Sequence, residues 1–292
     1  MSITALYVLC RWVHFASALQ IFGLVLFVGW IAPPALRHSL EKHTRVLLGT
    51  SLVFCAVSSW LMVTLQAGQM GDGWQDAFSP ETWLAVMQTT FGEAWWLQLI
   101  FSSLLLVTPL FSPKIRRFLF IFFAASLLMT LARTGHASVE QGISGIAHRL
   151  NNGIHLLSAG FWFGGLLPFW LCIRQLSGTV KAFAMQAVIR YSRWGHLAVV
   201  LVIVTGIGNA AWILGRWPLA LDSIYQRGLW LKILLVAVMI GIALYNRYCV
   251  VRSMGQNRQR ALTLLASNAV FEWILGLLAL LAVSFFATQP PI

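Results

Sequence analysis

The sequence predicts an all-α protein, a polytopic bundle of transmembrane helices with about eight spans in a single integral membrane domain covering residues 1–292. Hydrophobic residues make up 59% of the chain and charged residues only 10%. A soluble fold of this length needs more polar surface, so lipid is the expected solvent. The formal charge of +12 is spread in short basic groups between apolar runs, a pattern that excludes a single nucleic-acid-binding stripe and is typical of membrane loops.

Apolar runs that are long enough to cross a hydrocarbon core of ~30 Å recur along the whole chain. They lie at residues 8–32, 46–66, 94–112, 117–133, 150–173, 194–214, 229–250 and 267–287. No basic leader or small-residue cleavage site accompanies the first run, so we expect it to be a retained helix. Residues 75–90 are too short and too mixed in polarity to cross, and we expect an interfacial helix there.

The basic residues predict the orientation in the membrane. The loops after the first, third, fifth and seventh runs contain three, three, four and four basic residues, 14 in all, whereas the other loops contain four. Basic loops remain in the cytoplasm, so both termini are expected in the periplasm of a bacterial cytoplasmic (inner) membrane.

An internal similarity relates the first and fifth runs. Five positions repeat at an offset of 141, in the pairs His14 and His155, Ser17 and Ser158, Ala18 and Ala159, Phe22 and Phe163, and Gly23 and Gly164. Both runs cross in the same direction, so the offset predicts two four-helix halves, residues 1–133 and 148–287, related by an axis along the membrane normal. The alternative is a chance match between apolar segments.

Four histidines are the candidate metal ligands, because topology places them at or near the outer face: His14, His136, His148 and His155. The other three, His38, His43 and His196, lie on the inner side. His148 and His155 are seven residues apart, so they share a helical face with Asn152. Imidazole binds copper, zinc, iron and nickel, and an ionisable group inside a span usually marks a site or pathway. The simpler interpretation is that each histidine only hydrogen-bonds a neighbouring helix.

Further residues carry weaker signals. Cys10, Cys55, Cys172 and Cys249 form no C-x-x-C pair, so neither a zinc site nor a disulfide framework is indicated. We expect Lys232 to snorkel toward the outer interface as a topological anchor. For Glu272 we expect either pairing with a basic loop residue or an exit-side proton or cation site. No motif indicates catalysis or nucleotide binding, so we expect no enzymatic activity.

The combined pattern resembles the copper resistance protein D family (CopD, also PcoD-like), along the whole chain. The resemblance rests on Arg11-Trp12-Val13-His14-Phe15, Gly135-His136-Ala137, the segment from His148 through His155 to Pro168, Gly195-His196, Leu231-Lys232 and Asn246-Arg247-Tyr248. It implies a bacterial copper homeostasis protein that moves or accepts copper ions at the inner membrane, beside a separate small periplasmic copper-binding partner of the CopC type. Some relatives have a further histidine in the stretch where this chain has Asn152.

The expected function is copper import from an outer-face histidine site. His14 and His155 are expected to share one copper site at the interface of the halves, with His136 and His148 at its entrance. One alternative is a b-type cytochrome whose haem lies between histidines of two spans, since His14 and His155 have similar depths. A structural or assembly partner without its own ligand is the third interpretation.

Overall fold

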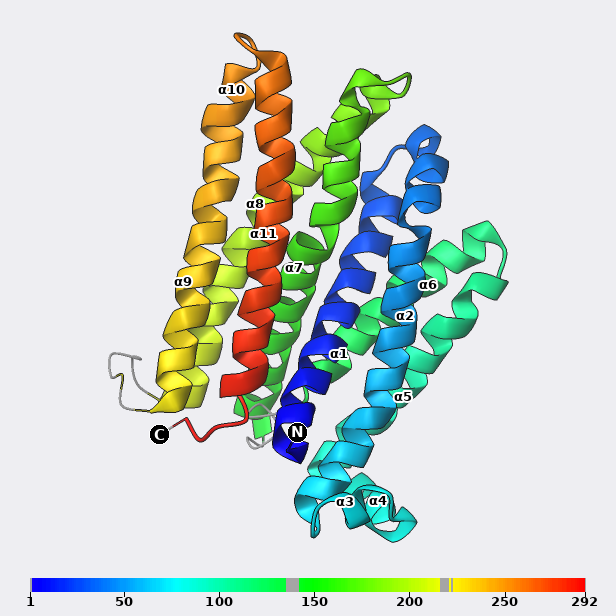
Figure 1. The fold of residues 1–292 in the computed structure, drawn as a ribbon, viewed down its shortest axis with the longest axis vertical. Coiled ribbons are helices and arrows are strands. Elements are labelled where there is room, and N and C mark those ends of the chain that lie inside the picture. Colours follow the sequence, from blue (N-terminus) through cyan, green and yellow to red (C-terminus); the bar gives the residue numbers. More distant parts are fainter. Residues whose placement is uncertain (1, 135–141, 216–220, 222, 292) are drawn as a thin grey trace.

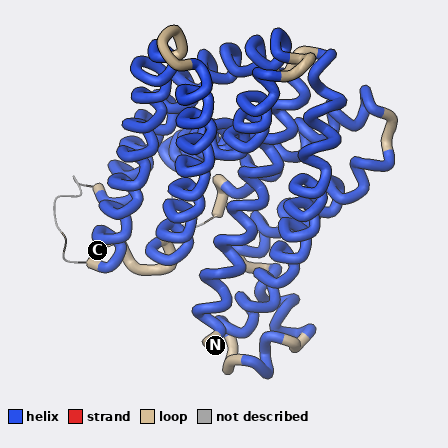
Figure 2. The backbone as a smooth tube through the Cα atoms, turned by 45° about the horizontal axis from the view of Figure 1, so that its top comes forward, coloured by secondary structure: helices blue, strands red, loops and turns tan. Residues whose placement is uncertain are grey.

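A computed structural model of the chain describes residues 2–134, 142–215, 221 and 223–291. Helices joined by short loops account for nearly all of these residues, and no strand occurs among them (Figure 2). The prediction of an all-α bundle is confirmed.

Eight long helices build the described part of the molecule. They are α1 (Ile3–Leu26, continued by the π-helical turn η1, Phe27–Ile31), α2 (Pro34–Met70), α5 (Thr90–Val107), α6 (Pro113–Leu131), α7 (Gly142–Arg174), α8 (Lys181–Leu214), α9 (Ile224–Tyr245) and α11 (Arg258–Phe286). The shorter elements are α3 (Trp74–Ala77), α4 (Pro80–Met87), η2 (Thr108–Leu110), η4 (Gln175–Ser177), η5 (Asn246–Val250) and α10 (Val251–Ser253). Seven of the long helices are apolar enough to cross a membrane by length and composition. The eighth, α6, has 19 residues and contains Lys114, Arg116 and Arg117 near its start.

The observed helices extend beyond the predicted apolar runs, mainly at the basic ends. Helix α2 begins at Pro34 rather than at residue 46, and α8 begins at Lys181 rather than at residue 194. Hydropathy detects only the segment that lies in lipid, whereas the added turns contain polar residues that continue the helix beyond it. Pro34 suits a helix start because its ring presets φ and no N–H is needed there.

The two ends of the bundle differ in content. Both termini lie at the end that also holds α3 and α4, while the loops with most of the basic residues lie at the opposite end (Figure 1). The interfacial helix expected at residues 75–90 is two short helices, because Ser79 starts α4 anew by accepting a hydrogen bond from the Thr82 amide. Which end faces the periplasm stays a prediction.

Helices α1 and α7 pack closely along the middle of the bundle. Gly23 of α1 meets Gly160 and Gly164 of α7, and a Cβ atom on Gly164 would lie 2.9 Å from the Cα of Gly23. In lipid no hydrophobic effect draws helices together, so their association depends on close packing of this kind. Gly23 and Gly164 are also a pair in the 141-residue offset, although the division into two related halves stays a prediction.

Candidate functional site

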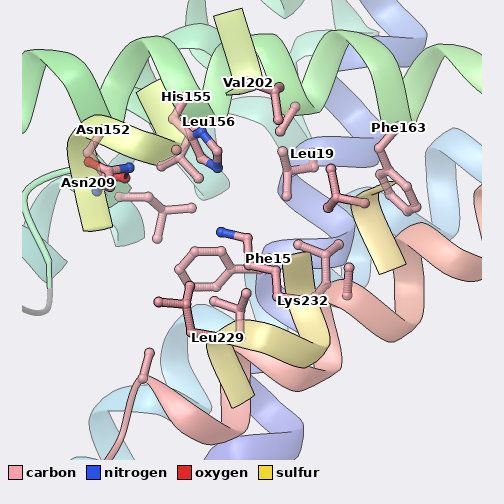
Figure 3. A pocket seen from close by; sticks show the side chains of 18 of the residues that line it. Phe15, Leu19, Asn152, His155, Leu156, Phe163, Val202, Asn209, Leu229 and Lys232 are labelled. Atoms are coloured by element: carbon pink, nitrogen blue, oxygen red, sulfur yellow. Dashed lines mark hydrogen bonds between the residues drawn. The ribbon is translucent and has the colours of Figure 1, made fainter. Parts of the chain in front are cut away.

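A cavity of about 210 Å³ lies between α1, α7, α8, α9 and α11 (Figure 3). It runs from the end that holds the termini, where Tyr225 and Phe286 line it, toward Phe163 and Met239 deeper in the bundle. Most of its wall is apolar. The polar and charged side chains on it include Arg11, Thr134, His148, Asn152, His155, Asn209 and Lys232.

His155 of α7 presents a free ring nitrogen to this cavity. Its Nδ1 lies 2.9 Å from the Thr205 hydroxyl of α8. That hydroxyl donates to main-chain carbonyls of its own helix, so it accepts from His155 and places the imidazole proton on Nδ1. The Nε2 lone pair has no hydrogen-bond partner among the described residues, and the ring points toward the cavity (Figure 3). This tautomer is the one that ligates a metal through Nε2.

His148 lies two turns before His155 on the same face of α7 and also lines the cavity. It is 2% exposed. Its ring stacks on Trp212 of α8, with centroids 5.3 Å apart and an interplanar angle of 7°. The indole therefore fixes the plane of this imidazole at the end of the cavity near the termini.

Asn152 has the predicted position between the two histidines, but its amide is already occupied. Its nitrogen donates to the Ala132 carbonyl at 3.3 Å, and its oxygen accepts from Asn209 at 3.2 Å. Asn151 donates to Asn209 at 2.9 Å and to the Thr205 carbonyl at 2.8 Å. The three amides fasten α7 to α8, so Asn152 has no free amide group to offer a metal.

His14 has a different environment. It is fully buried between α1, α2 and α5 and does not line the cavity. Its Nε2 lies 3.1 Å from Gln98 Oε1, and its Nδ1 lies 3.0 Å from Ser58 Oγ. Gln98 donates to the Leu127 carbonyl, which fixes its oxygen toward His14. The imidazole therefore holds three helices together.

His14 bonds to side chains of α2 and α5, whereas His155 bonds to α8 and lines the cavity. That the two share one copper site stays a prediction. Each imidazole turns into its own set of helices, even though α1 and α7 are neighbours. Because both ring nitrogens of His14 are hydrogen-bonded, a haem held between His14 and His155 has no support in this arrangement. His136 lies outside the described residues.

Met239 of α9 also lines the cavity, although its position in the sequence does not single it out as a candidate ligand. Lys232, Val236 and Met239 all line the cavity and follow the spacing i, i+4, i+7. That spacing places the three on one helical face. A charged residue within an apolar span indicates that its face turns toward the interior of the bundle, so Lys232 could have pointed to Met239.

Two further polar residues differ from expectation. Lys232 faces the cavity (Figure 3) rather than snorkelling to the interface. Glu272 of α11 is 3% exposed and accepts a hydrogen bond from Asn246 at 3.1 Å, and Asn268 in turn donates to Asn246. Within the described ranges the single ion pair joins Arg116 and Glu41. Glu272 thus pairs with an amide rather than with a basic loop residue.

Comparison with protein-family models covers most of the chain. Residues 1–146 match the model described as copper resistance protein D-like, N-terminal domain, and residues 185–286 match the model of copper resistance protein D. The chain belongs to the copper resistance protein D family. It is 37% identical to the inner membrane protein YebZ of Escherichia coli (strain K12) over 98% of both chains.

Two other relatives have names that refer to copper. The copper resistance protein D of Pseudomonas syringae pv. tomato is 27% identical over 82% of this chain and 80% of its own. The copper transport protein CutJ of Bacillus subtilis (strain 168) is 26% identical over 94% of this chain, which spans 51% of CutJ. No solved structure matches this copper resistance protein D family member. Family and apolar helices together make it a multi-pass protein of the bacterial inner membrane.

Proposed function

We propose that this protein imports copper ions across the cytoplasmic membrane and that copper enters through the cavity beside His155. The observation that carries the proposal is the His155 Nε2 lone pair, which faces a cavity at the bundle end that holds both termini. The distribution of basic loops favours the periplasm for that end.

Two side chains on the cavity wall are suitable copper ligands. Imidazole and thioether are soft enough for Cu(I), and His155 and Met239 line the same cavity. Among the described residues no three His, Cys, Asp or Glu side chains group into a metal site. A copper ion held by so few ligands would be released quickly, which suits transport better than storage. His148 would extend the route toward the periplasm, and the sequence adds His136 as a further candidate ligand. A CopC-type periplasmic protein would deliver the copper.

Uptake into vesicles tests this proposal. The purified full-length chain is reconstituted into liposomes containing a Cu(I) indicator, and the orientation of the inserted protein is measured by protease accessibility of a terminal tag. We expect copper supplied on the termini side to accumulate, and His155→Ala to lower the initial rate about tenfold or more.

The matched control is the double variant His38→Gln, His43→Gln, at the opposite end of the bundle. Both histidines neighbour Arg37, Lys42 and Arg45, which repel a cation, so uptake should remain near the wild-type rate. Uptake only from the opposite side would contradict import, and an unchanged rate in His155→Ala would contradict the entry site.

A further inference from the structure

Two cationic side chains line the cavity. Lys232 of α9 extends its ammonium group into the cavity that His155 also lines (Figure 3). Arg11 of α1 lines the same cavity, with its guanidinium 5.5 Å from the centroid of the Phe15 ring. Neither makes an ion pair within the described ranges, and no Asp or Glu is among the cavity's lining residues.

Such an arrangement is unfavourable without a counter-charge. A charged group removed from water is stable only when an opposite charge or several hydrogen bonds compensate it. Two positive charges that line one cavity also repel each other. A bare copper cation beside His155 would add a third positive charge. An anion placed between Lys232 and Arg11 would gain charge-assisted hydrogen bonds from both.

The apolar walls of the cavity indicate that the anionic group belongs to a partly apolar molecule. Phe15, Leu156, Leu229 and Val236 give it apolar walls. Its volume of about 210 Å³ exceeds the ~150 Å³ of an apolar cavity that accepts benzene. The space therefore accommodates a small organic body as well as a charged head.

We propose that this cavity binds an anionic group, a carboxylate or phosphate carried on an apolar body, between Lys232 and Arg11. The site is independent of copper transport, although a bound anion would also relieve the repulsion that the two cations exert on copper at His155. A small free acid and an anionic membrane lipid share this chemistry.

Equilibrium dialysis with 4-fluorobenzoate tests the site in full-length protein held in nanodiscs of phosphatidylcholine alone. The neutral isostere 4-fluorobenzamide reports the contribution of the apolar walls. We expect saturable binding of 4-fluorobenzoate to the wild type, and binding about tenfold weaker or worse for the amide and for Lys232→Gln. Lys232→Arg keeps the charge and should retain most of the affinity. Lys181→Gln, at the opposite end, is the matched control.

Thermal unfolding provides a second measurement that distinguishes loss of anion binding from misfolding of a variant. Without the anion, Lys232→Gln should unfold at the same temperature as the wild type or higher, because it removes an uncompensated charge. With 4-fluorobenzoate present, the wild type should gain more in Tm than the variant. Equal binding of acid and amide, or equal binding by wild type and Lys232→Gln, would overturn the proposal.

Nanodiscs that contain phosphatidylglycerol separate the two sources. If the natural occupant is an anionic lipid, phosphatidylglycerol should weaken 4-fluorobenzoate binding to the wild type. If it is a free acid, the affinity should not change with lipid composition. Either result supports an anion site. Absence of saturable binding to the wild type in neutral lipid would contradict it.

Discussion

His14 and His155 share five matching positions in their local sequence but have different environments. Ser58 of α2 and Gln98 of α5 occupy the nitrogens of His14, whereas Thr205 of α8 bonds Nδ1 of His155 and Nε2 faces the cavity. These partners lie on other helices, and the rotation of each helix is set by packing. The amino-acid sequence therefore predicts that both imidazoles lie within spans, but it does not predict which imidazole keeps a nitrogen available to a metal.

The first prediction separates a structural imidazole from a ligand. Replacing His14 with alanine leaves the buried Gln98 oxygen without its donor and opens a cavity, so we expect a loss of about 2–4 kcal/mol in the free energy of unfolding. His155→Ala removes one hydrogen bond beside an existing cavity and should cost less than half as much. Denaturant unfolding in detergent measures both. Equal losses would contradict the assignment of roles.

Copper uptake provides a second contrast between these residues. Because the two imidazoles belong to separate environments, the effects of His14→Ala and His155→Ala on folded, abundance-matched protein should add within about 0.5 kcal/mol. A full double-mutant cycle of initial uptake rates measures this. Strong non-additivity would indicate one shared site after all.

At the scale of elements, the long helices could be predicted because each contains an apolar run of membrane-spanning length. Their ends could not, since the turns added to α2 and α8 are polar. Gly160 and Gly164 of α7 form a small-xxx-small pair, a sequence pattern typical of close helix packing. Their partner Gly23 required the structure.

A third prediction concerns that approach. A methyl group on Gly164 would overlap the Leu19 carbonyl oxygen of α1 and crowd Gly23, so Gly164→Ala should cost about 1–3 kcal/mol in stability. Gly195→Ala in α8 is the matched control, because nothing lies within 4 Å of a Cβ built there. The control should be neutral or slightly more stable, since alanine favours a helix. Equal behaviour of the two variants in thermal unfolding would show that the helices do not meet at Gly164.

For the whole molecule, the arrangement of charge predicts topology. Cytoplasmic reporter activity is expected for fusions at residues 41, 115, 182 and 257, and periplasmic activity for fusions at 75, 140, 220 and 292. The reason is the 14-to-4 division of basic loop residues. An inverted pattern would turn the cavity toward the cytoplasm and change import into export.

The central claim is that copper is bound in the cavity by His155. Copper K-edge X-ray absorption on the purified, Cu(I)-loaded protein tests it most directly, with His155→Ala, Met239→Leu and His14→Gln measured at equal protein concentration. The claim predicts imidazole scattering that weakens in His155→Ala, sulfur scattering that weakens in Met239→Leu, and an unchanged spectrum in His14→Gln. Copper that keeps its full imidazole signal in His155→Ala, or loses it in a folded His14→Gln, would contradict the claim.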